Sequence, residues 1–175
     1  CGPDNSGGLE AKGGRIYGGT LKLSETEKFQ TIYPYSVTDV ISSNICYQIY
    51  EGLLKFNPRN PSEVIPGIAT SYKVNSEGTV YTFILKKGVF FHDDPCFPEG
   101  KGLEVTAEDI SYSFQLLCTQ TAGNQQFGAT FKDKVKGATE FYNASASGTG
   151  HSGGIEGIKV IEPSTIEITL NEPSF

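Results

Sequence analysis

The feature that most constrains the fold is a hydrophobic hairpin pattern between residues 71 and 85. Two runs rich in β-branched and aromatic residues, Ser71 to Val74 and Val80 to Leu85, flank the turn-forming segment Asn75 to Gly78. This pattern predicts two antiparallel strands joined by a short turn, in which the glycine adopts a positive φ. Apolar residues occupy both odd and even positions of the second run, so we expect that strand to be covered on both faces.

A capped helix is predicted after the hairpin. Thr106 and Asp109 have the spacing of a capping box, and apolar residues follow them with a helical period. The sequence therefore predicts a helix from about Ala107 to Cys118. A further periodic run predicts a helix from about Lys132 to Asn143.

Three blocks, in the same order along the chain, resemble one known family. The first is IYPYSVTDVISSNICYQIYEGLLKFNP, which is similar to that family's first helix, entered from a proline turn. The second joins EGTVYTFILKKGVFFHDD to the helix VTAEDISYSF, and the third is the closing hairpin from Ile155 to Pro173. These blocks resemble the family 5 extracellular solute-binding proteins, which deliver peptides, nickel chelates and related solutes to ABC importers.

The resemblance implies an α/β fold of the periplasmic binding protein-like II class, with a mixed or antiparallel sheet and about three helices. It implies a first-lobe strand at Thr20 to Leu23. The first ligand-binding lobe would begin over residues 19–52, and a small second domain would cover residues 53–175, ending at the return to the first lobe. Family members are longer and close two lobes on the ligand, so we expect an N-terminal fragment from which the opposing lobe is absent.

One segment departs from the family pattern. Between Asp94 and Glu104 the chain makes a longer excursion than family members usually show before the capped helix. This departure leaves the path of the loop open without changing the expected fold.

Charge and hydropathy exclude two classes of protein. The formal net charge is -6 and the isoelectric point is about 4.9, with no stripe of Lys and Arg. A nucleic-acid surface needs clustered basic residues, so a nucleic-acid partner is not expected. The longest apolar runs have the length of strands, too short to cross a bilayer.

The first residue predicts a lipid anchor. Cys1 and Gly2 precede a stretch rich in Gly, Ser and charged residues, as at the mature start of a bacterial lipoprotein. Residues 1–18 would form a flexible tether, because this composition cannot build a core. We therefore expect an extracytoplasmic, membrane-anchored protein in the periplasm or at the cell surface. The alternative is that the sequence simply starts at a cysteine.

Three cysteines remain beyond the first. An oxidising compartment permits a disulfide, and Cys96 in the long loop could reach Cys118 at the end of the capped helix. Cys46 lies in the predicted first helix and is interpreted as a small buried hydrophobic residue. The alternative is that all three thiols are free.

Neither a metal site nor a catalytic site is predicted. His92, Asp93, Asp94 and Cys96 are suitable ligand types, but adjacent residues in a turn point in different directions and no second cluster supports them. They are interpreted as a structural turn. The other histidine, His151, lies in a glycine-rich loop that gives no rigid support for catalysis. We therefore expect a binding protein without catalytic residues or a cofactor.

The resemblance also implies where a ligand would bind. The segment before the family's first helix faces the cleft between lobes, and here it contains Thr38, Asp39 and Val40. Asp39 has an alternative role as the N-cap of that helix. Family members carry an aromatic ligand contact after the capped helix, and Phe127 is the nearest match. The alternative is that Phe127 packs inward.

Two functional hypotheses follow from the sequence. The first is a lipid-anchored receptor that captures oligopeptides or dipeptides and hands them to the permease of an ABC importer, without chemistry. The second is a surface lipoprotein that uses the same fold for adhesion or sensing, or that binds a non-peptide solute such as a nickel complex or a sugar.

Overall fold

The computed structural model describes residues 10–11, 15–16, 20, 22–146 and 153–174. Cys1 lies outside the described residues, as do most of the expected tether and His151. Within the expected tether, β1 (Glu10–Ala11) pairs antiparallel with β2 (Arg15–Ile16).

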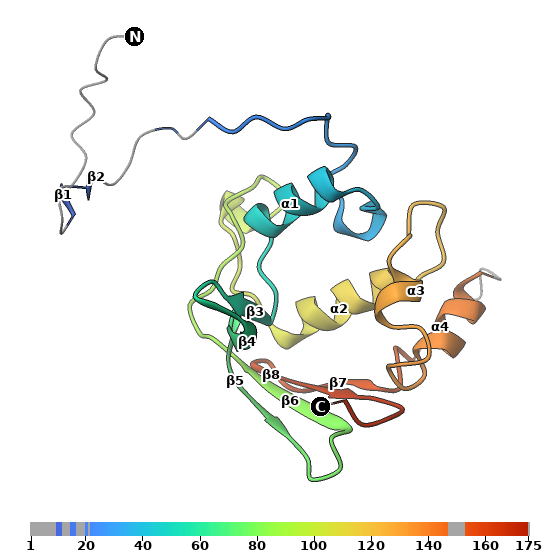
Figure 1. Ribbon diagram of the computed structural model, residues 1–175. Helices are drawn as coiled ribbons and strands as arrows, with labels where there is room; N and C mark the ends of the chain where they lie inside the picture. Colours follow the sequence, from blue (N-terminus) through green and yellow to red (C-terminus); the bar gives the residue numbers. More distant parts are fainter. Residues whose placement is uncertain (1–9, 12–14, 17–19, 21, 147–152, 175) are drawn as a thin grey trace.

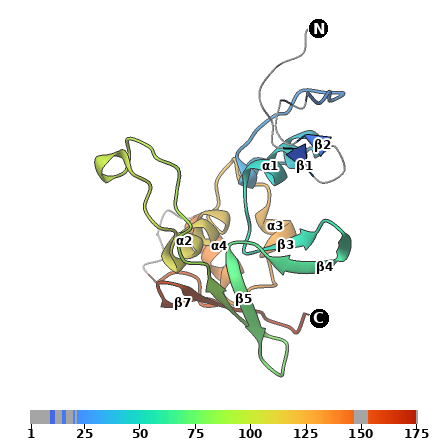
Figure 2. The same cartoon turned by 90° about the vertical axis from the view of Figure 1, so that its left-hand side faces the viewer.

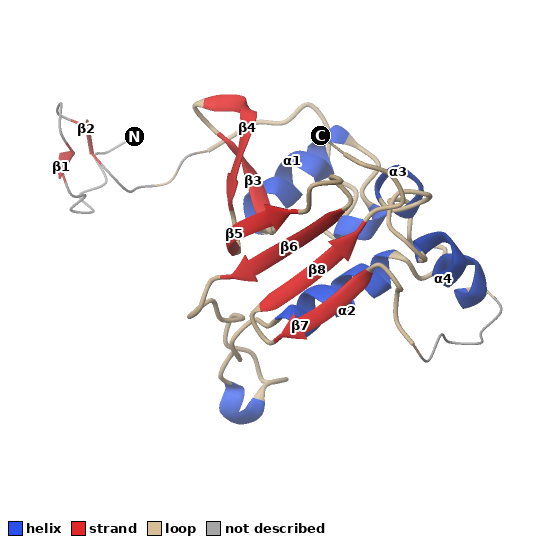
Figure 3. Cartoon of the chain, turned by 90° about the horizontal axis from the view of Figure 1, so that it is seen from below, coloured by secondary structure: helices blue, strands red, loops and turns tan. Residues whose placement is uncertain are grey.

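A four-stranded antiparallel sheet forms the base of the molecule, with the strand order β5-β6-β8-β7 (Figure 3). Its strands are β5 (Ala69–Val74), β6 (Val80–Leu85), β7 (Ile158–Glu162) and β8 (Thr165–Thr169). The predicted hairpin is thus confirmed as β5 and β6, and Gly78 in its turn has φ 71°. The closing hairpin is confirmed as β7 and β8, and β8 pairs with β6.

The sheet is covered on one face only. Helices lie above the sheet in Figure 1, and none of the helices in the described part of the chain lies below it. Phe83 and Leu85 of β6 point into the core and are buried, whereas Ile84 between them is 39% exposed. The prediction that this strand is covered on both faces is therefore wrong, because the chain supplies helices to one side of the sheet alone.

The capped helix packs on the covered face as α2 (Ala107–Leu117) (Figure 1). Its capping box is confirmed, because the Thr106 N–H donates to Asp109 Oδ2 at 2.8 Å. The Ala107 N–H donates to the carbonyl of Pro163 between β7 and β8, which ties the helix start to the sheet. Ala107 and Ile166 are fully buried where helix and sheet meet. The core also contains Ala69, Phe83, Leu85, Cys118, Phe127, Val135, Ala138, Phe141, Ile155 and Ile158.

In the described part of the chain two helices follow α2, one that was not predicted and one that starts later than predicted. They are α3 (Phe127–Thr130) and α4 (Ala138–Ser145). The helix predicted from Lys132 to Asn143 is wrong in its first half, where Asp133 and Gly137 have φ values of 59° and 72°. Positive φ is incompatible with a right-handed helix. In this stretch Val135 instead forms a β-bridge with Leu170 beside the sheet, so α4 starts only after Gly137.

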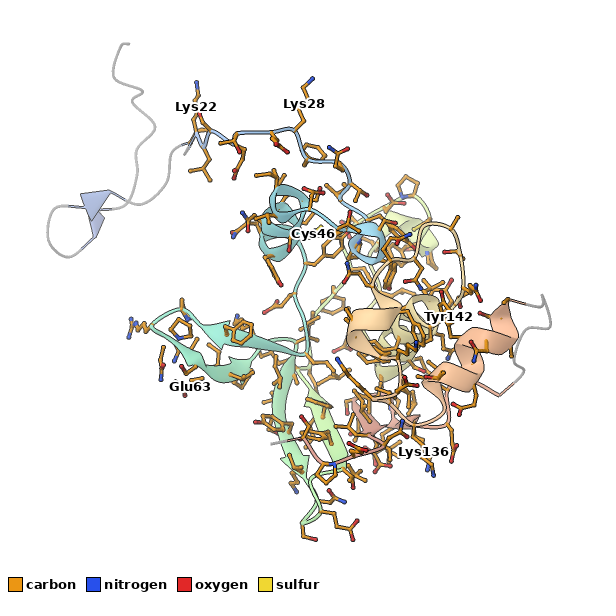
Figure 4. The ribbon with its side chains drawn as sticks, turned by 45° about the vertical axis from the view of Figure 1, so that its right-hand side comes forward. Lys22, Lys28, Cys46, Glu63, Lys136 and Tyr142 are labelled. Atoms are coloured by element: carbon orange, nitrogen blue, oxygen red, sulfur yellow. The ribbon has the colours of Figure 1, made fainter. Side chains whose placement is uncertain are left out.

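The first helix is α1 (Val40–Ile49), preceded by the short 3-10 turn η1 (Pro34–Ser36). Ser42, Cys46 and Tyr50, four residues apart along α1 and its C-terminal end, contact the chain segment that precedes η1. Ser42 Oγ accepts a hydrogen bond from the Gln30 N–H at 2.9 Å, and the Tyr50 hydroxyl donates to the Ile32 carbonyl at 3.1 Å. Cys46, labelled in Figure 4, lies between them and is half-buried, with Sγ 3.7 Å from the Ile32 carbonyl oxygen.

The strand predicted at Thr20 to Leu23 is wrong. Residues 20, 22 and 23 have no regular secondary structure, and none of the described residues offers them a neighbouring strand. A strand requires such a neighbour for its hydrogen bonds.

Two hairpin-like segments project from the body of the fold. The first is formed by β3 (Leu54–Asn57) and β4 (Asn60–Pro66), and Figure 4 shows Glu63 near its outer end. The second is the long excursion before α2, seen as a projecting arm in Figure 2. A bridge between Phe90 and Glu104 joins its two sides, and the 3-10 turn η2 (Pro98–Gly100) lies near its end. The longer loop is therefore an ordered arm.

The expected disulfide between Cys96 and Cys118 is not formed. Cys96 lies exposed on the arm, whereas Cys118 is fully buried at the end of α2, and both are free thiols. The two halves of the arm pair with each other, so Cys96 is held away from the core. The open alternative of free thiols at Cys46, Cys96 and Cys118 is thus the one observed.

None of the helices in the described part of the chain is long and apolar enough to span a membrane.

Replacement of Ile166 tests the position of the core. We expect Ile166→Val to lower the free energy of unfolding by about 1 kcal/mol, because it removes a methylene from a fully buried site. Ile161 lies on the neighbouring strand and is 54% exposed, so Ile161→Val should change stability by less than about 0.5 kcal/mol. Urea denaturation of both variants measures the difference, and equal effects would contradict the assignment of the two faces.

Thiol labelling tests the cysteine assignment. Burial raises the pKa of Cys118 to about 12, so its thiolate is scarce as well as inaccessible. We expect maleimide to label Cys96 in the native protein at least roughly tenfold faster than Cys118, with both labelled after unfolding without reductant. Mass spectrometry of digests measures the labelling, and a peptide pair linked through these two cysteines would contradict the structure.

Candidate functional site

A groove of about 570 Å³ lies between the first half of α1 and the far end of α2. Three parts of the chain line it: the segment from η1 through most of α1, the last residue of α2, and the two ends of α3. Its lining residues are Pro34, Tyr35, Val37, Thr38, Asp39, Val40, Ser43, Asn44, Cys46, Tyr47, Leu117, Gln126 and Thr130.

The predicted ligand segment forms one wall of this groove, because Thr38, Asp39 and Val40 all line it. Thr38 is exposed, and neither its N–H nor its carbonyl makes a hydrogen bond within the described residues. The preceding residue, Val37, is extended, with φ -69° and ψ 123°. Thr38 thus lines the groove between two extended residues, Val37 and Asp39, with one backbone donor and one acceptor that no described residue engages.

Asp39 caps the helix that begins beside the groove. Its Oδ1 accepts a hydrogen bond from the Ser42 N–H at 2.7 Å, so the alternative role as N-cap is confirmed. This N–H also holds the pKa of Asp39 below its ordinary value. The second oxygen, Oδ2, is buried and has no hydrogen-bond partner in the described structure. The carboxylate is therefore committed to α1, and its contact with a ligand stays a prediction.

The groove wall extends from Tyr35 to Val40, and Tyr35 connects it to α2. Its hydroxyl donates to the Ser113 carbonyl on α2 at 3.0 Å, and its own carbonyl accepts from the Gln125 N–H at 2.8 Å. Burial raises the pKa of Tyr35, so the hydroxyl keeps the proton that it donates.

Two further hydrogen bonds join the same wall to the turn before α3. The Ser36 hydroxyl donates to the Gly123 carbonyl, and the side-chain amide of Gln126 donates from Nε2 to the Val37 carbonyl. Hydrogen bonds therefore hold the wall against α2 and this turn, although the bonded residues are 78 to 89 positions apart in the sequence.

Phe127 does not line the groove. It is 5% exposed, and its ring stacks on that of Tyr142 in α4 with centroids 4.0 Å apart and planes 2° apart. The prediction of Phe127 as a ligand contact is thus contradicted, and its alternative, inward packing, is observed. The groove residue at this place is its neighbour Gln126, which the sequence reasoning missed because it searched for an aromatic side chain.

The acidic turn within the arm has a structural role, as predicted. Asp93 accepts hydrogen bonds from Lys101 Nζ at 2.6 Å and from the Gly102 N–H at 3.0 Å, and Asp94 accepts from the Cys96 N–H at 2.9 Å. Among the residues that the structure describes, no group of three His, Cys, Asp or Glu side chains is placed to hold a metal ion.

A second groove, of about 600 Å³, lies between the C-terminal end of α1 and the β3–β4 hairpin. Tyr47, Phe56 and Val64 line it with largely exposed side chains. It contains none of the residues predicted from the sequence, so the first groove is the candidate site.

The sequence model of the bacterial extracellular solute-binding proteins, family 5 middle, matches residues 63–175. The chain belongs to this family. The resemblance seen in the three sequence blocks is therefore confirmed, and two of the blocks, the β6–α2 region and the closing hairpin, fall within the match. The family is one of solute-binding proteins and not of enzymes, in agreement with the prediction of binding without catalysis.

Curated relatives are similar to this chain over the aligned regions, with identities of 27–30% in the three described here. It is 30% identical to the dipeptide-binding protein of Escherichia coli over 71% of its length, and 28% identical to the periplasmic oligopeptide-binding protein OppA of the same species over 88%. It is also 27% identical to heme-binding protein A of Haemophilus influenzae over 71% of its length. The chain spans only 20–25% of the length of these relatives.

Solved structures agree with this assignment. A periplasmic oligopeptide-binding protein of Borrelia burgdorferi, OppAIV, matches 82% of the chain with a TM-score of 0.68 and 28% identity. The Helicobacter pylori protein DppA, solved with the peptide STSA, matches 82% of the chain with a TM-score of 0.59 and 25% identity. The chain covers 26% and 25% of these structures. The predicted α/β fold of the periplasmic binding protein-like II class is confirmed, with antiparallel sheets.

Proposed function

We propose that this chain is part of an extracytoplasmic receptor that captures oligopeptides or dipeptides and presents them to the permease of an ABC importer. The observation that carries the proposal is the backbone of Thr38, which lines the groove and whose N–H and carbonyl have no partner among the residues that the structure describes. Binding requires no chemistry on the ligand.

An extended peptide fits this wall because its own backbone offers a complementary donor and acceptor. Pairing of a peptide with an exposed extended segment supplies affinity that does not depend on the peptide's side chains. A receptor for peptides of varied sequence needs recognition of this kind. The relatives named for dipeptides and oligopeptides support this ligand class.

The rest of the groove suits a side chain of the bound peptide. Val37, Val40 and Leu117 give it apolar walls, and Asp39 is its one carboxylate, already engaged at the start of α1. The groove is therefore a place where an uncharged side chain can be buried without leaving an ionic group unpaired.

The arrangement of the whole receptor is part of the proposal. Residues 19–52 would begin the first ligand-binding lobe and residues 53–175 would form the small second domain. Closing of an opposing lobe over the groove would complete the hydrogen bonds to the ligand.

A non-peptide solute is the second candidate, because one relative is named as a heme-binding protein. The same fold used for adhesion or sensing, without an importer, is the third. Identification of the ligand separates these candidates.

Ligand identification tests the proposed function. We expect the full-length protein, purified without denaturation, to retain short peptides that native mass spectrometry detects. Calorimetry with an equimolar mixture of tri- to pentapeptides then measures affinity. Retention of heme or a metal chelate, without binding of this peptide mixture, would contradict the assignment of peptides as the ligand. The proposal that the protein is a solute receptor would still stand.

Two substitutions at Thr38 test the backbone interaction within the same experiment. Thr38→Pro removes the N–H, and Val37 already has the extended conformation that a following proline requires. We expect it to weaken peptide binding roughly tenfold, because one hydrogen bond is lost and its acceptor is left unpaired. Thr38→Ala keeps the N–H and serves as the matched control. Equal affinities of the two variants would contradict the role of the backbone.

A lipid anchor at Cys1 is included in the proposal. The support is the residue types at the start of the sequence, a cysteine and a glycine followed by a polar, glycine-rich stretch. We expect mass spectrometry of the protein from its native host to show acyl chains on Cys1. An unmodified cysteine at this position, in protein recovered from the aqueous fraction, would contradict the anchor.

A further inference from the structure

The Thr38 N–H shares a peptide unit with the carbonyl to which Gln126 binds. The Val37 carbonyl and the Thr38 N–H belong to one planar trans group, and the described residues contain no cis peptide bond. The two bonds of such a group point in opposite directions. The hydrogen bond from Gln126 Nε2 to the Val37 carbonyl therefore sets the direction in which the Thr38 N–H points.

Hydrogen bonds also hold Gln126 in place, so its side chain can fix the direction of the Val37–Thr38 peptide unit. Its N–H donates to the side-chain oxygen of Asn124 at 3.2 Å, and its carbonyl accepts from both the N–H and the hydroxyl of Thr130, at 3.1 and 2.6 Å. Asn124 is buried and donates from Nδ2 to the Leu117 and Thr119 carbonyls at the end of α2. A continuous set of hydrogen bonds thus connects α2 to the Val37–Thr38 peptide unit.

The neighbouring glutamine has no such role. The side-chain amide of Gln125 donates to the Ala122 carbonyl at 3.2 Å, within its own turn. The contact of Gln125 with the groove wall uses its backbone N–H, which any substitution except proline keeps.

We propose that Gln126 is a positioning residue that aims the Thr38 N–H at a bound peptide through the Val37 carbonyl. This inference rests on the proposed function, since it assumes that the Thr38 backbone is where the ligand pairs. The hydrogen bond also polarises the peptide unit, which strengthens the N–H as a donor. Ligand affinity would then depend on a side chain that acts through another residue.

Hydrogen exchange of the unliganded full-length protein is the first test. Gln126→Met and Gln126→Glu differ in polarity, but both remove the donor, so they should act alike. We expect exchange across residues 36–44 to rise about fivefold in both, because a constraint on the wall is lost. The matched controls Gln125→Met and Gln125→Glu should stay within about twofold of the unsubstituted protein. Unchanged exchange in both Gln126 variants would overturn the proposal.

A double-mutant cycle is the second test, with the mixture of tri- to pentapeptides as the probe. We expect Gln126→Met to weaken binding about tenfold in the unsubstituted protein and less than about twofold in the Thr38→Pro background, where the N–H is already absent. A merely structural role for Gln126 would give the same loss in both backgrounds, and that result would overturn the proposal.

The two tests separate this inference from the function on which it rests. Absence of peptide binding by the unsubstituted protein would refute the proposed function, and with it the ligand part of this inference. The exchange measurement needs no ligand, so it decides independently whether Gln126 holds the wall.

Discussion

The packing of α2 on the four-stranded sheet is the interaction on which the rest of the structure depends. One side of this helix covers Ile166 and the neighbouring core residues, and its start is held by the Pro163 carbonyl between β7 and β8. Its other side supports the groove, because the Ser113 carbonyl accepts the hydroxyl of Tyr35 and Leu117 lines the groove itself. Any movement of α2 relative to the sheet would therefore also move the candidate site.

Few apolar contacts hold the groove wall in place. The segment before α1 contributes one buried apolar residue, Val37, and is held mainly by hydrogen bonds to α2 and to the turn before α3. Hydrogen bonds fix direction more strictly than apolar contact does. Such a wall can hold Thr38 between extended neighbours with its backbone groups free of partners among the described residues.

Several predictions succeeded because their signals are local. The β5–β6 hairpin follows from alternating strand residues around a glycine turn, and α2 follows from the Thr106 and Asp109 capping box. Other predictions failed where a distant part of the chain decides the outcome. The helix expected from Lys132 was replaced by a β-bridge between Val135 and Leu170, and the expected disulfide was prevented because the arm carries Cys96 away from Cys118.

The sequence by itself determined the family, the strand and helix order of the α2 region, and the segment from Thr38 to Val40 that lines the groove. These features depend on residue types and spacings a few positions apart. Only the tertiary structure decided that Phe127 is a core residue and that Gln126 faces the groove. Adjacent residues at the start of a helix point in different directions, and which of them faces the groove depends on Tyr142 and Val37, which come from elements distant in the sequence.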